Sequence, residues 1–165
     1  MKKIKVKFTG FWEEFNPDDN FLTDILKKHF SVQLSDTPDY VISSVLGTPY
    51  EYCNYRHAVR ILFSGENYSA DFNLFDYAIG FDRCSYGDRY LRYPLYLLYQ
   101  KDLQRAEEKH KNDFVKILEC KTRFCNLVYG HDTDDFQRKR IFEKLSEYKK
   151  VDSGGTYLNN MGGEL

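Results

Sequence analysis

The chain has 165 residues, enough for one domain with a hydrophobic core, or for one domain and part of a second. Hydrophobic residues make up 42% of it and charged residues 30%, which is typical of soluble globular proteins and excludes a disordered chain. The formal net charge of −1 and the isoelectric point near 6.4 create no overall field that favours nucleic acid or anionic lipid.

The four cysteines, Cys53, Cys84, Cys120 and Cys125, form no CxxC pair. We therefore expect free thiols in a reducing compartment rather than disulfides or a metal site. The N-terminal MKKIKVKFTG lacks the long apolar run of a signal peptide. No segment approaches the ~20 apolar residues of a membrane span. These features predict a soluble, cytoplasmic protein.

Aromatic residues are unusually frequent, at 17%, with 14 Tyr and 13 Phe. Tyrosines in this number cannot all lie in a core, so several should lie on the surface or line a groove. Aromatic faces of this kind bind sugar rings, and they also bind protein partners.

The first half of the chain alternates short apolar runs with long connections. We expect strands over residues 3–8, 30–34, 40–45, 59–63 and 77–81. A helix over residues 21–29 is predicted by the turn and N-cap residues 16–20 and by the helical spacing of Phe21, Leu22, Ile25 and Leu26. Long connections favour a parallel sheet in an α/β domain over an antiparallel meander.

The second half begins with an extended segment, 89–93, and helical patterns over 103–111 and 112–120. The composition then changes. The sequence predicts a strand over 123–129, a helix over 134–148, a strand over 149–152 and a Gly-Gly turn. The last helix has Phe136, Ile141, Phe142 and Leu145 as its predicted buried stripe. A two-stranded unit cannot close its own core, so it either begins a second domain or completes the first sheet.

Residues 63–93 form the most informative stretch. A strand end runs into a turn of small residues, Ser64, Gly65, Glu66 and Asn67, and a second apolar run follows. Strand, polar turn and strand is how α/β proteins place a reactive group at a sheet edge. Taken alone, the pattern leaves Glu66 as either a reactive carboxylate or a plain turn residue.

Within this stretch, GEN, FNLFDYAIGFD and DRYLRYPLY resemble the N-terminal domain of family 10 glycosyltransferases, the α-1,3/4-fucosyltransferases, and above all their bacterial members. Looser similarity covers the FWE loop at 11–13, the FCNLVY strand and the VDSGG turn at 151–155. The resemblance implies the N-terminal half of a GT-B architecture, an α/β fold with a Rossmann-like, open and mainly parallel sheet.

The resemblance further implies inverting transfer of L-fucose from GDP-fucose to a hydroxyl of N-acetylglucosamine or glucose in an N-acetyllactosamine-like glycan. No cofactor and no DxD-bound metal are expected, because GDP-fucose is the donor substrate and the GT-B scaffold does not use such a metal. Residues 1–118 would be the acceptor-binding domain, and residues 119–165 the beginning of a truncated donor domain. The family's main donor-binding segment is absent, so the chain alone is expected to be inactive. Full-length members can also associate peripherally with membranes.

The resemblance assigns the catalytic base to Glu66. An inverting transfer needs a partly shielded carboxylate at a strand end, which takes the proton of the attacking hydroxyl. Asn67 could hold a hydroxyl of the acceptor. Asp82 closes a strand, where a ligand-facing carboxylate and a structural cap are equally plausible.

Three aromatic residues are candidate acceptor contacts. Trp12, the single tryptophan, follows the first strand and is either a surface on which a sugar stacks or a core aromatic. Tyr90 and Tyr93 could line the same cleft.

Arg138 lies near the start of the helix predicted over 134–148. It resembles a donor-phosphate arginine of the family, and a helix N-terminus with an arginine suits phosphate. The alternative is a solvated charge beside Lys139 and Arg140. Asp132-Thr133-Asp134 mimics a DxD motif, but N-capping explains it more simply.

Two functions from different classes follow. The first is the acceptor-binding part of a fucosyltransferase. The second is a non-catalytic α/β module that binds carbohydrate or protein, a remnant of such an enzyme.

Overall fold

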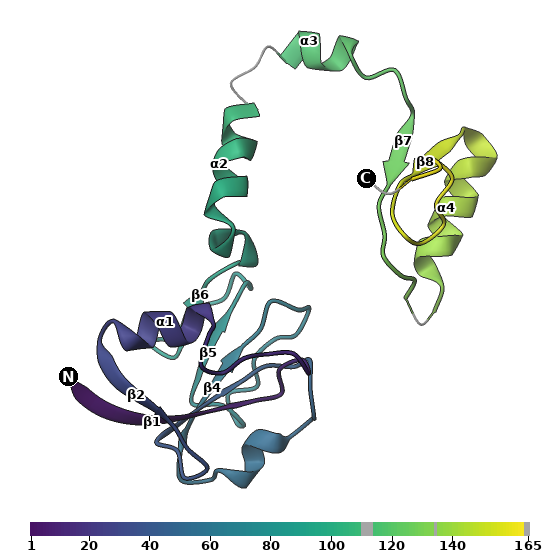
Figure 1. Ribbon diagram of the computed structural model, residues 1–165. Helices are drawn as coiled ribbons and strands as arrows, with labels where there is room; N and C mark the ends of the chain where they lie inside the picture. Colours follow the sequence, from purple (N-terminus) through teal and green to yellow (C-terminus); the bar gives the residue numbers. More distant parts are fainter. Residues whose placement is uncertain (110–113, 134, 164–165) are drawn as a thin grey trace. The chain divides into compact units, whose positions relative to one another are not determined.

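A computed structural model describes residues 1–109, 114–133 and 135–163 (Figure 1). The chain divides into two compact units, Met1–Gln104 and Arg105–Leu165, and each is described by itself. The boundary between the units falls within a helix. The expected boundary between functional domains, at residue 118, stays a prediction.

The first unit contains one sheet of six strands. In chain order they are β1 (Lys2–Thr9), β2 (Phe30–Leu34), β3 (Tyr40–Ser43), β4 (Val59–Phe63), β5 (Tyr77–Gly80) and β6 (Tyr90–Arg92). Their order in the sheet is β2-β1-β3-β4-β5-β6, and every neighbouring pair is parallel. The predicted α/β class with a mainly parallel sheet is confirmed.

Both faces of this sheet are buried, as a parallel sheet requires. One face contributes Ile4, Val6, Ile42 and Phe63 to a core that also contains Leu22 of α1 (Phe21–Lys27). The opposite face contributes Val41, Leu62 and Ala78, which pack with Tyr52 of the 3₁₀ helix η1 (Glu51–Asn54) and with Phe75. Full burial of a side chain such as Leu62 stabilises the fold by roughly 1.5–3 kcal/mol.

Helix α1 begins as the sequence predicts. The Asn20 side chain accepts a hydrogen bond from Thr23 N at 3.0 Å, which satisfies one of the free N–H groups of the first turn. The helix ends at Lys27, two residues before the predicted end, because β2 already starts at Phe30.

A second 3₁₀ helix, η2 (Leu95–Leu98), precedes α2 (Gln100–Lys109), and α3 (Phe114–Glu119) follows. The second unit then contains β7 (Cys125–Leu127), α4 (Gln137–Tyr148) and β8 (Val151–Ser153). β7 and β8 pair in parallel as a separate two-stranded sheet. The alternative that these strands complete the first sheet is therefore wrong. None of the described helices has an apolar stretch long enough to cross a bilayer.

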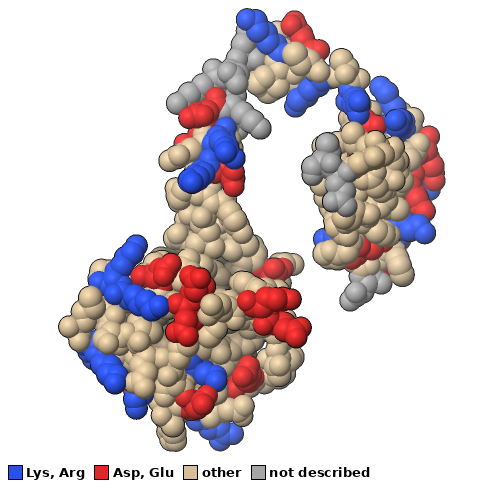
Figure 2. All heavy atoms as spheres, in the orientation of Figure 1, with Lys and Arg blue, Asp and Glu red and all other residues tan. Residues whose placement is uncertain are grey.

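The buried stripe predicted for α4 is wrong in two positions. Phe136 is 61% exposed and Ile141 is 48% exposed, whereas Phe142 and Leu145 are half-buried. Two strands are too narrow to cover the whole apolar side of a three-turn helix. On the face shown in Figure 2, acidic and basic side chains are interspersed over the first unit and form no field of one sign.

The loops that follow β1 and β3 are fixed to each other through backbone groups. Gly10 O accepts hydrogen bonds from Leu46 N at 2.9 Å and from Gly47 N at 2.7 Å. Gly10 has a φ of +67°, and a Cβ at this position would lie 2.4 Å from Ser44 O. Only glycine allows both the left-handed backbone and this close approach.

Gly10→Ala should lower the free energy of unfolding of the first unit by about 3 kcal/mol, because backbone strain and overpacking add. Gly87→Ala is the matched control, since Gly87 has a φ of +59° with nothing near its Cβ position. It should cost only about 1 kcal/mol, from backbone strain alone. Urea unfolding followed by Trp12 fluorescence measures both, and equal losses would contradict this account of the Gly10 contact.

Candidate functional site

The carboxyl ends of the parallel strands meet at one edge of the sheet, which is where open α/β sheets bind ligands. Three buried residues lie at this edge: Thr9 ends β1, Ser43 ends β3, and Ser64 follows β4. The strand order reverses between β1 and β3, whose neighbours extend in opposite directions. The loops that follow β1, β3 and β4 at this edge therefore form the candidate site.

The Glu66 turn leaves β4 at this edge. Ser64 N donates to Ile79 O at 3.0 Å, Glu66 N donates to Ser64 Oγ at 3.2 Å, and Tyr68 N donates to Glu66 O at 2.7 Å. A Cβ on Gly65 would lie 2.5 Å from the Leu95 side chain, so η2 backs the turn closely. The turn thus has a defined backbone path.

The side chains of Glu66 and Asn67 are both exposed. In the described part of the chain, no hydrogen bond or ion pair reaches the Glu66 carboxylate. The partial shielding expected around a catalytic base is therefore not supplied by the residues of this unit. The carboxylate remains open to a ligand that approaches the edge.

Asp82 follows β5 and is tied to the same turn. Its Oδ2 accepts a hydrogen bond from Ser69 Oγ at 2.9 Å, and its backbone oxygen accepts one from Tyr90 Oη at 3.3 Å. Burial, with lesser contributions from Cys84 and Asp82, raises the pKa of Tyr90. The structure therefore brings Asp82, Tyr90 and the end of the Glu66 turn together.

Tyr93 does not join this group. Tyr90 packs against the core that contains Ala78, whereas Tyr93 lines an apolar cavity of about 230 Å³ with Phe63 and Leu91 on the opposite face. Residues three apart in an extended strand point to opposite faces, so one cleft cannot hold both tyrosine rings. The two rings therefore lie on different faces of the sheet, and a role for Tyr93 in acceptor binding stays a prediction.

Trp12 is 49% exposed in the loop after β1, so the core alternative for this residue is wrong. Its ring lies 5.2 Å from the ring of Phe15, edge to face, and 5.9 Å from that of Phe11. The exposed indole is thus supported from behind by two phenylalanines at the carboxyl edge of β1.

Arg138 is held near the end of β7 rather than being a freely solvated charge. Its Nη1 donates to His131 O at 2.6 Å, and its guanidinium lies 4.7 Å from the centroid of the Tyr129 ring. Its backbone N–H donates to Asp132 Oδ1 at 3.1 Å. The side chain therefore has a fixed direction at the start of α4.

Asp132 accepts a backbone hydrogen bond from Arg138 in the first turn of α4, although the N-cap position itself is Phe136, which has no side-chain cap. Its Oδ1 also accepts from Thr133 N at 2.9 Å, and its Oδ2 accepts from Tyr157 Oη at 2.6 Å. Burial raises the pKa of Asp132, but hydrogen bonds from Tyr157 and from backbone N–H groups outweigh this effect and lower the pKa overall. Asp134, the other carboxylate of the DxD pattern, lies outside the described residues.

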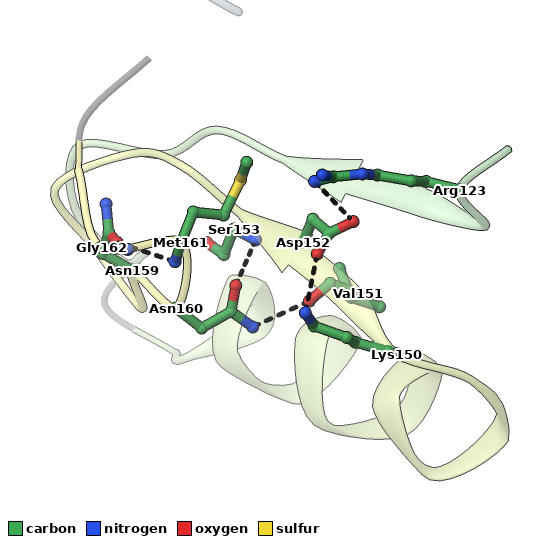
Figure 3. Close-up of polar contacts among 9 residues, drawn as sticks. All are labelled: Arg123, Lys150, Val151, Asp152, Ser153, Asn159, Asn160, Met161 and Gly162. Carbon is green, nitrogen blue, oxygen red and sulfur yellow. Dashed lines mark hydrogen bonds and ion pairs between the residues drawn. The ribbon is translucent and has the colours of Figure 1, made fainter. Parts of the chain in front are cut away.

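A cluster around Asp152, at the centre of β8, was not predicted from the sequence (Figure 3). Asp152 is 7% exposed and forms ion pairs with Arg123 at 3.3 Å and with Lys150 at 3.2 Å. The Asn160 side chain accepts from Ser153 N and donates to Val151 O, both at 2.8 Å. An acidic residue in a short predicted strand that begins with two lysines is the signal that could have indicated the cluster.

Comparison with known proteins decides the family. Residues 6–99 match the model of the α-(1,3)-fucosyltransferase FucT N-terminal domain. The chain belongs to this family. The match runs from the middle of β1 to the end of η2 and therefore includes the whole candidate site at the sheet edge.

A curated relative, the α-(1,3)-fucosyltransferase FucT of Helicobacter pylori, is 40% identical over 197 aligned residues. The alignment covers 96% of this chain and 41% of the relative, so the chain spans less than half the length of that protein.

Solved structures of α1,3-fucosyltransferase have the same fold. One with GDP-fucose has a TM-score of 0.64 at 23% identity, and one with GDP has a TM-score of 0.64 at 26% identity. Each alignment covers 99% of this chain and 56% of the other.

Asp132→Asn should lower the urea midpoint of the second unit at pH 7, because an amide nitrogen cannot accept the Tyr157 hydrogen bond. Since the folded-state pKa of Asp132 is lowered, the stabilisation is present above the unfolded pKa of about 3.9 and is lost as the pH falls through the folded value. The difference between wild type and variant should therefore shrink below about pH 4.

The control is Glu147→Gln, which removes only an exposed ion pair with Lys144. It should change the midpoint little at any pH. An Asp132→Asn difference that persisted undiminished at low pH would contradict the assigned role of the carboxylate.

Proposed function

We propose that this chain is the acceptor-binding part of a fucosyltransferase that transfers L-fucose from GDP-fucose, with inversion, to a hydroxyl of N-acetylglucosamine or glucose in a glycan. The observation that carries the proposal is the exposed Glu66 carboxylate, at the carboxyl edge of the sheet and inside the segment that matches the family model. The names of the relatives support the reaction and the donor.

In the proposed reaction, a Glu66 carboxylate oxygen takes the proton of the attacking hydroxyl as the hydroxyl oxygen forms a bond to C1 of fucose. The bond from C1 to the diphosphate oxygen breaks, and GDP leaves with its electron pair. A positioned carboxylate of this kind contributes about 10²–10⁴-fold to such a step. The missing shielding around Glu66 would come from the bound acceptor and donor, which exclude water.

We assign the remaining acceptor-binding roles to residues at this edge of the first unit, and a donor-phosphate role to Arg138 of the second unit. Asn67 and Asp82 would bind acceptor hydroxyls, Trp12 would stack on a sugar ring, and Tyr90 would hold Asp82 in place. Arg138, with its fixed direction at the start of α4, would contribute positive charge to the diphosphate.

Tyr93 lies on the opposite face of the sheet. Its effect on acceptor binding would be indirect, through packing at the end of β6. We further propose that the protein acts in the cytoplasm.

Glu66→Gln in the full-length enzyme should lower the rate of fucosyl transfer about 10²–10⁴-fold, because the amide cannot accept the hydroxyl proton. Binding of GDP-fucose should be unchanged, which a direct titration checks. Glu14→Gln, an exposed glutamate in the loop after β1, is the control and should keep the rate within about two-fold. A Glu66→Gln rate within a few-fold of wild type would rule out the proposed base.

A further inference from the structure

A second cavity opens at the same sheet edge, next to the Glu66 turn. It encloses about 190 Å³ beyond the carboxyl end of β3. Its lining includes Ser44 and Thr48 from the loop after β3, Tyr50 and Tyr52 from the start of η1, and Tyr68 and Phe75 from the connection after β4. Ligand pockets for larger molecules reach roughly 300–1,000 Å³, so a cavity of this size suits a single ring.

The floor of the cavity is buried, and its walls include exposed side chains. Tyr52 and Phe75 form the floor, with ring centroids 4.5 Å apart and exposed fractions of 7% and 2%. The walls include Tyr50, 67% exposed, and Tyr68, 43% exposed. Burial raises the pKa of Tyr52, and nearby Cys53, Tyr68 and Tyr50 raise it further. Several phenol groups therefore surround one small space.

The backbone at Tyr50 is strained, with a φ of 59° in the left-handed region. For a residue other than glycine this costs on the order of 1–3 kcal/mol and is found most often at functional sites. Cys53 N donates to Tyr50 O at 2.9 Å, which closes the first turn of η1 and holds the strained residue. The exposed ring of Tyr50 is thus presented at the mouth of the cavity at an energetic cost.

The cavity and the Glu66 carboxylate share one turn. Tyr68 is two residues after Glu66, and its N–H donates to Glu66 O at 2.7 Å. A ligand ring that packs against Tyr68 would therefore lie next to the turn that carries the Glu66 carboxylate. Tyrosine faces and hydroxyl groups around a small space match the C–H face and hydroxyl rim of a pyranose.

We propose that this cavity binds the acceptor sugar ring adjacent to the ring that is fucosylated, with Tyr50 and Tyr68 stacking on it. These tyrosines are then specificity-determining residues that favour a disaccharide acceptor over a monosaccharide. The inference rests on the proposed fucosyltransferase function and adds to it a second sugar subsite.

The test measures the affinity of the 165-residue chain for N-acetyllactosamine and for N-acetylglucosamine by ligand-observed NMR titration. Tyr68→Ala and Tyr50→Ala should each weaken disaccharide binding about 5–10-fold and leave monosaccharide binding within two-fold. Tyr68→Phe, which keeps the ring, should retain most of the affinity. Tyr77→Ala is the matched control, because Tyr77 is also 43% exposed but lies at the amino edge of the sheet.

The other possible results would overturn the second subsite, the fucosyltransferase function, or both. Equal loss for both sugars, or loss for neither, overturns the second subsite. If the tyrosine variants keep full disaccharide affinity while Glu66→Gln abolishes transfer, the subsite is wrong and the fucosyltransferase function stands. If neither sugar binds the chain and the full-length enzyme transfers no fucose, both proposals fall. Unchanged Trp12 fluorescence confirms that each variant is folded.

Discussion

The hydrogen bond from Ser64 N to Ile79 O, 3.0 Å long, fixes the point at which β4 stops and the Glu66 turn begins. It continues the parallel ladder of β4 and β5 by one residue past Phe63. Because every strand of this sheet runs the same way, the loops after β1, β3, β4 and β5 all leave at one edge. The candidate base, the exposed indole of Trp12 and the tyrosine-lined cavity share that edge for this reason.

The two units satisfy the backbone N–H and C=O groups of their strands in different ways. The first unit extends one ladder over six strands, while β8 in the second has its outer edge met by the side chain of Asn160. The amide of Asn160 substitutes for a neighbouring strand, since it donates to one backbone group and accepts from another. Asp152 is buried in β8 and forms ion pairs with Arg123 and Lys150, whose side chains are mostly exposed.

Much of the fold could be predicted from the sequence. Short apolar runs between turn residues, such as VRILF in β4, are typical of buried strands. The opposite faces of Tyr90 and Tyr93 follow from their spacing of three and could have been predicted as well. The tyrosine-lined cavity could not, because Tyr50, Tyr68 and Phe75 meet only through the order of the strands. The exposure of Ile141 could not be predicted either. It depends on how many strands cover α4, and the spacing of apolar residues within the helix does not indicate that number.

The most direct test is a crystal structure of the full-length enzyme with GDP and N-acetyllactosamine bound. The account predicts an acceptor hydroxyl within hydrogen-bond distance of a Glu66 carboxylate oxygen, and the adjacent ring between Tyr50 and Tyr68. A disaccharide bound on the opposite face, in the apolar cavity lined by Phe63 and Tyr93, would contradict it.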